Sequence, residues 1–298
     1  FSVCGSLTEA NHVFQSLHLR NVFSWCAIIS ANTKAGMYQQ ALELYAQMLR
    51  SRVVPDGHVF SSVLQACAGA SALYEGKLVH MQITEGEFQN DEFIGSTLLH
   101  MYSTCGTLID AHKVLDDLPK KGLITWSAMI SEYAQHGDGQ QALALFYQMQ
   151  QSRVDPDSVT LSSLLKACSN INSVLEGNIL YSYAVEMGYD TAIVVENAVI
   201  DMYVNCGLLA EAKELLHEFP IQDTISWTAL IAGNTKHGQG DEALNCFKQM
   251  HNEGVLPSTV TLICSLKACG SLGSLKHGQE IHAKICIQGL AAKDISVG

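Results

Sequence analysis

Proline, tryptophan and long apolar runs are scarce in this sequence, whose 298 residues include five prolines and three tryptophans. No apolar run approaches the roughly 18 consecutive residues that a membrane-spanning helix needs. Low-complexity tracts are absent, and with 48% hydrophobic and 15% charged residues the chain lacks the low hydrophobicity of a disordered one. These absences argue against a membrane span and against disorder, and they predict a chain that is ordered along its length.

Signatures of catalysis and metal binding are missing as well. The ten cysteines form no CxxC pair, and the twelve histidines are scattered rather than gathered at ligand spacing. No glycine-rich phosphate loop, GxSxG elbow, HExxH helix or zinc-deaminase signature occurs. We therefore expect no catalytic residue, no metal and no cofactor in this chain, and we expect buried thiols in a reducing compartment.

Positive charge is also in short supply. The chain has 17 Lys and Arg against 29 Asp and Glu, which gives a formal net charge of −12. Proteins that bind nucleic acids usually carry an excess of Lys and Arg. The acidic balance favours a different class, a protein-interaction scaffold that holds a peptide or a partner helix without binding RNA.

The scarce residues recur at a single interval. Trp25, Trp126 and Trp227 lie 101 residues apart. The same interval separates further sets of residues: Pro55, Pro156 and Pro257; Pro119 and Pro220; Cys67, Cys168 and Cys269. A fixed period in the rarest residues predicts a repeat array, in which each unit packs only on its neighbours.

Each period divides into three related repeat units, of about 35, 35 and 31 residues. The predicted units are 22–56, 57–91, 92–122, 123–157, 158–192, 193–223, 224–258 and 259–294. Residues 1–21 are assigned to the end of a preceding short unit, and residues 295–298 to the start of another. Because the chain opens and stops inside a unit, we expect it to be a fragment of a longer protein.

Every unit is predicted to fold as two helices. In the first unit, Trp25 recurs at helical spacing with Ile28 and Ile29, and a second apolar stripe follows the glycine of Lys34-Ala35-Gly36. Asp56 and Asp157 directly follow the prolines between units, where they are expected to cap the next helix. Helix pairs of this kind stack, so the predicted fold is all-α, a right-handed superhelical α-solenoid of helix-turn-helix repeats.

Three segments, VFSWCAIISANTKAGMYQQALELYAQMLRSRVVPD, LITWSAMISEYAQHGDGQQALALFYQMQQSRVDPD and TISWTALIAGNTKHGQGDEALNCFKQMHNEGVLPS, resemble the pentatricopeptide repeat. They alternate with units such as SVTLSSLLKACSNINSVLEGN and MYSTCGTLIDAHKVLDDLP, which is similar to the plant organelle subclass that cycles through standard, long and short repeats. The resemblance covers the whole chain. It implies a standard repeat at 22–56, a long one at 57–91, a short one at 92–122, and the same order thereafter.

The resemblance implies binding of single-stranded RNA, one base per repeat, read by the fifth and the last residue of each unit. Asn197 with Asp223 matches the pairing that favours uracil in the family. Ser127 with Asp157 matches the pairing for guanine, and Ser61 with Asp91 has the same residues in a long unit. Read from 5′ to 3′ along the chain, units two to six give guanine, any base, guanine, any base and uracil.

Other units match no well-defined pair. They hold Cys26 with Asp56, Ser96 with Gly122, Ser162 with Ala192, Thr228 with Ser258, and Ile263 with Asp294. For Asn197 and for the acidic residues the alternative is a purely structural role at a helix start, which is common for Asn and Asp.

The resemblance also implies that each base is held between the second residues of adjacent units. Seven apolar residues suit this role: Phe23, Phe93, Ile124, Val159, Val194, Ile225 and Val260. His58 departs from the pattern, although its ring can still stack on a base.

A lysine near the end of the first helix meets the RNA backbone in the family, and Lys34 and Lys236 fill that place here. Thr104, Gln135 and Asn205 stand at the equivalent positions. With so few cations, we expect specific RNA binding with modest salt sensitivity.

The family further implies a mitochondrion or a chloroplast, although no targeting segment is visible at the start. It implies work with organellar editing or processing factors, such as cytidine-to-uridine editing. A deaminase-like extension would lie outside this fragment.

Overall fold

The computed structural model describes residues 7–106, 108–119 and 121–287. Within these ranges every regular element is a helix. The described chain divides into two compact bodies: the first body holds the described residues up to 133 and residues 145–155, and the second body holds residues 134–144 and the described residues from 156 onward. The predicted unit start at 295–298 and Asp294 lie outside the described residues.

The first body contains the N-terminal helices in chain order. They are α1 (Leu7–Ser16), α2 (Val22–Lys34), α3 (Tyr38–Arg50), α4 (Gly57–Ala70), α5 (Leu73–Glu85), the short 3-10 helix η2 (Phe88–Asn90), α6 (Glu92–Cys105) and α7 (Leu108–Asp117). Both bodies share α8 (Leu123–Gln135) and α9 (Gly139–Gln151).

The second body continues the same pattern. It contains α10 (Ser158–Asn170), α11 (Val174–Glu186), α12 (Ile193–Asn205), α13 (Leu209–Glu218), α14 (Thr224–Lys236), α15 (Gly240–Asn252), α16 (Thr259–Leu272) and α17 (Leu275–Ile287).

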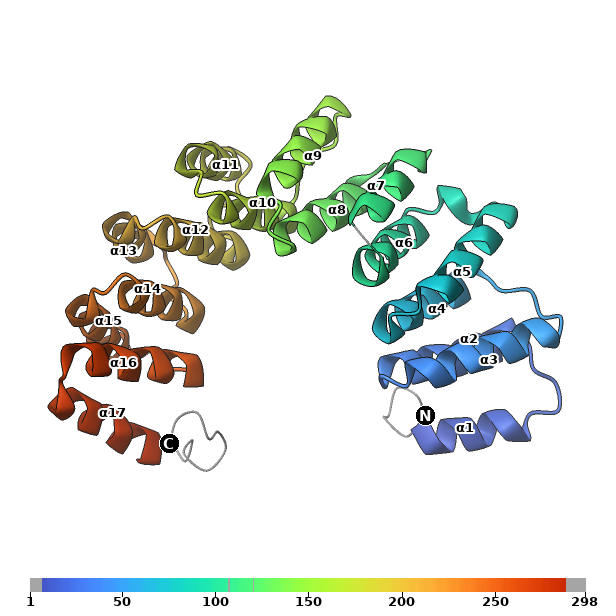
Figure 1. The fold of residues 1–298 in the computed structure, drawn as a ribbon, viewed down its shortest axis with the longest axis horizontal. Helices are drawn as coiled ribbons and strands as arrows, with labels where there is room; N and C mark the ends of the chain where they lie inside the picture. The colour runs from blue at the N-terminus through green and yellow to red at the C-terminus, as the bar shows by residue number, and fades with distance from the viewer. Residues whose placement is uncertain (1–6, 107, 120, 288–298) are drawn as a thin grey trace. The chain divides into compact units, whose positions relative to one another are not determined.

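Helices alternate between two layers within each body. In the second body α10, α12, α14 and α16 pack on one another in order, and each also packs on the helix that follows it (Figure 1). In the first body α2, α4 and α6 do the same. The prediction of an all-α fold built from stacked helix pairs is confirmed in both bodies.

The first helix of each pair starts at the first residue of a predicted unit. These starts are Val22, Gly57, Glu92, Leu123, Ser158, Ile193, Thr224 and Thr259. We therefore keep the term repeat unit for the predicted ranges, and we call the helix that starts a unit its first helix.

The tryptophans that recur every 101 residues lie in the core. Trp25, Trp126 and Trp227 are each at most 3% exposed. On the second helices, the repeating alanine and methionine of the predicted stripe are completely or almost completely buried: Ala41, Ala142, Ala243, Met48, Met149 and Met250. Each helix pair therefore buries its apolar faces against its neighbours, as a repeat array requires.

The first helix of the first unit ends as the sequence predicts. It ends at Lys34, and Gly36 follows with a φ of 75°. This left-handed conformation favours glycine because glycine has no Cβ to clash with the backbone.

Eight cysteines between Cys26 and Cys269 are free thiols, and four of them are buried: Cys67, Cys168, Cys246 and Cys269. Burial raises the pKa of Cys67 and of Cys168 to about 12, and that of Cys246 to about 11. Thiols with such pKa values stay protonated at neutral pH and are poor nucleophiles or metal ligands.

Candidate nucleic-acid interface

The last residue of several units caps the helix that opens the next unit. Asp56, Asp157 and Asp223 accept a hydrogen bond through Oδ1 from the backbone N–H three residues on, at 2.9, 2.8 and 2.8 Å. Asp91 Oδ1 accepts from the N–H groups of Phe93 and Ile94, at 2.9 and 3.2 Å. The expected capping by Asp56 and Asp157 is confirmed, and Asp91 and Asp223 act in the same way.

The structure brings Asn197 and Asp223 together in the second body. Asn197 Nδ2 donates a hydrogen bond to Asp223 Oδ2 at 3.0 Å, and the Ser226 hydroxyl donates to Asn197 Oδ1. The two oxygens of the Asp223 carboxylate therefore have different partners. Oδ1 caps α14, and Oδ2 accepts the amide of Asn197, the fifth residue of the unit. Asn197 stays half-buried, so part of its side chain remains open to solvent.

The electrostatics of this pair favour an ionised carboxylate. Burial by itself would raise the pKa of Asp223, but hydrogen bonds from Asn197 and Ser226 outweigh it and hold the pKa below its ordinary value. The pKa of Glu196, next to Asn197, is shifted in the opposite direction. It is 2% exposed, its Oε1 accepts no hydrogen bond among the described residues, and burial followed by the charges of Asp223 and Asp190 raises its pKa.

Thr228 and Ser258 are joined through a third hydroxyl. Thr261 Oγ1 lies 2.6 Å from Thr228 Oγ1 and 2.8 Å from Ser258 Oγ. Ser258 and Thr261 also form a capping box at the start of α16. Thr261 and Ser226 are each the third residue of their unit, a position outside the predicted pairs of fifth and last residues. A hydroxyl residue recurring there is the signal that would have pointed to it.

The fifth residues of the first two units, Cys26 and Ser61, are in different surroundings from Asn197. Ser61 is only 4% exposed, and its hydroxyl lies 3.4 Å from that of Thr97, so it offers little surface to a ligand. Cys26 is half-buried, and burial followed by the charge of Asp56 raises its pKa. No hydrogen bond joins Ser61 to Asp91 within the described part of the chain.

Ser127 belongs to the first body and Asp157 to the second. Ser127 is half-buried on α8. The Asp157 Oδ1 atom also accepts the hydroxyl of Thr160, the third residue of its unit, at 2.7 Å.

The second residues of the units are exposed apolar side chains. The seven predicted stacking residues, Phe23, Phe93, Ile124, Val159, Val194, Ile225 and Val260, are between 41% and 75% exposed, and His58 is exposed as well. Each stands one residue after the start of a first helix. An apolar residue left in water at the same place in successive units is typical of a surface that contacts a ligand.

The two predicted phosphate contacts are exposed at helix ends. Lys34 and Lys236 are the last residues of α2 and α14, and neither forms a salt bridge within the described ranges. Both ammonium groups are therefore available to an anion.

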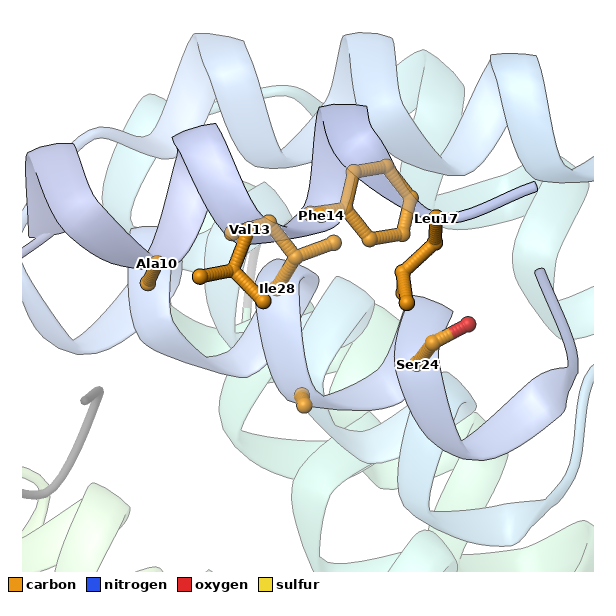
Figure 2. A pocket seen from close by; sticks show the side chains of 7 residues that line it. Ala10, Val13, Phe14, Leu17, Ser24 and Ile28 are labelled. Atoms are coloured by element: carbon orange, nitrogen blue, oxygen red, sulfur yellow. The ribbon is translucent and has the colours of Figure 1, made fainter. Parts of the chain in front are cut away.

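A pocket near the start of the chain has a different character. This pocket between α1 and α2 is apolar apart from Ser24, as Figure 2 shows, and holds no charged side chain; it is lined by Ala10, Val13, Phe14, Leu17, Ser24, Ala27 and Ile28. The described residues contain no group of three His, Cys, Asp or Glu side chains placed to hold a metal ion. None of their helices is long and apolar enough to cross a membrane.

Stacked helix pairs with polar and apolar residues repeated at the same helix starts define an α-helical repeat protein. The PPR repeat family model matches residues 20–69, 122–170 and 222–271, and a PPR repeat model matches residues 197–220. The chain belongs to the pentatricopeptide repeat (PPR) family.

Two relatives from Arabidopsis thaliana match the entire chain. The pentatricopeptide repeat-containing protein At4g18520, chloroplastic, is 32% identical over 298 residues, and At2g03380, mitochondrial, is 31% identical over 300 residues. The matches cover 48% and 43% of these relatives, so the chain spans less than half of their length.

Solved structures share the fold. The pentatricopeptide repeat protein PPR10 in complex with an 18-nt psaJ RNA element matches with a TM-score of 0.75 and 18% identity, over 93% of this chain and 42% of that one. PPR10 from maize matches with a TM-score of 0.60 and 18% identity, over 97% of this chain and 48% of that one.

Proposed function

We propose that this chain binds single-stranded RNA in a sequence-specific manner, one base per repeat unit. The observation that carries the proposal is the row of exposed apolar second residues beside helix starts that hold hydrogen-bonding fifth and last residues. Flat bases stack on such side chains, and the polar groups between them read base edges. The likeness to a PPR protein bound to RNA supports this function.

Individual residues have different roles in this proposal. Asn197 presents its amide to a pyrimidine edge, while Asp223 orients that amide, which favours uracil at the sixth base. Ser127 with Asp157 favours guanine at the fourth base. At the second base the exposed Asp91 contacts guanine, and the buried Ser61 contributes its small size. Cys26 with Asp56 and Thr228 with Ser258 contact the first and seventh bases, and Lys34 and Lys236 contact phosphates.

The place of action is an organelle. The relatives are named chloroplastic or mitochondrial, which supports one of these two compartments. The order of standard, long and short units supports the subclass whose members direct RNA editing. In this proposal the chain positions a transcript for cytidine-to-uridine editing or another processing step, and other factors supply the chemistry.

The net charge of −12 favours one rival, a scaffold that binds a protein instead of RNA. Selection from a random single-stranded RNA pool at about physiological salt separates the two. Enrichment of guanine at the fourth base and uracil at the sixth is the result that RNA reading requires. Retention without enrichment would indicate backbone binding only, and no retention by folded protein would favour the scaffold.

A further inference from the structure

We propose that Glu92 supplies the carboxylate of the base site in unit 92–122, and that this unit selects guanine together with Ser96. The last residue of the unit is Gly122, which has no side chain to read a base. The inference rests on the proposed RNA binding, and it assigns a base to a unit whose fifth and last residues form no recognised pair.

The Glu92 carboxylate occupies the place of the missing side chain. A Cβ added to Gly122 would overlap the Oε1, Cδ and Oε2 atoms of Glu92. Glu92 Oε1 also accepts the backbone N–H of Ile124, the second residue of α8, at 2.9 Å. Glu92 therefore caps α8 from the preceding first helix, as an aspartate at position 122 would do from within the chain.

Glu92 and Gly122 both depart from the residue types found at the same positions of the other units. Among the eight predicted units, 92–122 alone begins with an acidic residue and alone ends with glycine. Their counterparts 101 residues later are Ile193 and Asp223. The carboxylate thus stands at the first position of unit 92–122 and at the last position of unit 193–223. In both units it caps the first helix of the following unit.

In both residues one carboxylate oxygen caps a helix start. In Asp223, Oδ1 caps α14 and Oδ2 is directed to the fifth residue. In Glu92, Oε1 caps α8, and Oε2 accepts no hydrogen bond from the residues that the structure describes. The side chain is half-buried, so this second oxygen is the atom left for a ligand.

The chemistry of that oxygen selects among bases. The Watson–Crick edge of guanine places two N–H donors side by side, and the two lone pairs of Glu92 Oε2 can accept both of them. Adenine and cytosine offer one donor next to an unprotonated ring nitrogen, and uracil flanks its single N–H with carbonyl oxygens. The small Ser96 side chain, whose hydroxyl donates to the Phe93 carbonyl at 2.9 Å, leaves room for the larger purine.

The test uses the 298-residue protein and four RNA oligonucleotides that differ only at the third base. Wild type should bind the guanine oligonucleotide about tenfold more tightly than the others, the size expected for a paired contact to a base edge. Glu92→Gln keeps an acceptor for the Ile124 N–H but replaces the second oxygen with a donor, so the guanine preference should be lost. Glu92→Ala combined with Gly122→Asp returns the carboxylate to its usual position and should restore it.

Glu43→Gln, an exposed change on α3, is the matched control and should keep the wild-type preference. A guanine preference that persists in folded E92Q, or that is absent from wild type while selection at the sixth base remains, would overturn this inference alone. Failure of folded wild type to bind any RNA would overturn the proposed function itself.

Discussion

Asn197 and Asp223 are separated by 26 positions in the sequence, and their side chains meet at 3.0 Å through an amide-to-carboxylate hydrogen bond. The same carboxylate accepts the N–H of Ser226 and so fixes the start of α14. The orientation of the amide and the position of a helix end are therefore set by one group. We therefore expect a change at Asn197 to alter base preference, and a change at Asp223 to loosen the start of α14.

Asn197→Ser is expected to move the preference at the sixth base from uracil toward guanine, because serine removes the amide and frees space for a purine beside Asp223. The change in relative affinity should be about tenfold, as for other contacts to base edges. Binding to oligonucleotides that vary only at the sixth base measures it. Asn252→Ser, at the exposed end of α15, is the control. An unchanged preference would return Asn197 to a structural role.

Asp223→Ala should loosen the first turn of α14 without unfolding the array. Loss of an N-cap costs about 1 kcal/mol, so the Ser226 amide should exchange its hydrogen about fivefold faster at pH 7. The pKa of Asp223 is lowered in the folded protein, so its stabilisation is complete above the ordinary value of 3.8 and is lost as the pH falls through the folded pKa. The difference between variant and wild type should therefore vanish in acid. The Thr160 amide, capped by Asp157, is the internal control.

Glu196→Gln is expected to stabilise the protein at neutral pH. Glu196 is buried with an unsatisfied oxygen near Asp223 and Asp190, and its pKa is raised. Its ionisation therefore opposes folding at pH 7. This penalty shrinks as the pH falls through the folded pKa and is gone below the ordinary value of 4.5.

Urea unfolding should show a gain of about 1 kcal/mol for E196Q at pH 7 and none near pH 4. Glu186→Gln, on the exposed end of α11, should have no effect at either pH. Equal gains at both pH values would mean that charge is not the cause.

Helix starts could be predicted because their signals are local. Pro156 lies in the link between α9, which ends at Gln151, and α10, which Asp157 caps, so the period and such caps together indicate where first helices start. The links across units could not be predicted in this way. Ser226 reaches Asn197 over 29 positions, and Glu92 reaches Ile124 over 32. Such contacts depend on how neighbouring helices pack, which propensities and periodicity do not describe.

Lys34→Gln and Lys236→Gln should each lower the salt dependence of RNA binding. Each phosphate contact to a single strand contributes about 0.7 to the slope of log affinity against log salt concentration, so the double variant should lose about 1.4. The order of base preferences should stay the same. Lys77→Gln on α5 is the control. A steep slope that survives both substitutions would point to phosphate contacts elsewhere.

Ile225 and Ile221 provide the sharpest test of the exposed apolar second residues. Their exposed fractions are similar, 64% and 60%, and they differ mainly in their position relative to α14. Ile225 is the second residue of its unit on α14, whereas Ile221 precedes that helix. Replacing either with alanine should change the free energy of unfolding by less than about 0.5 kcal/mol, because neither is buried. Ile225→Ala should weaken RNA binding several-fold, on the order of 1 kcal/mol, by removing one face of a base sandwich. Ile221→Ala should leave the affinity unchanged. Equal effects of the two substitutions would mean that the row of second residues is not the surface on which bases stack.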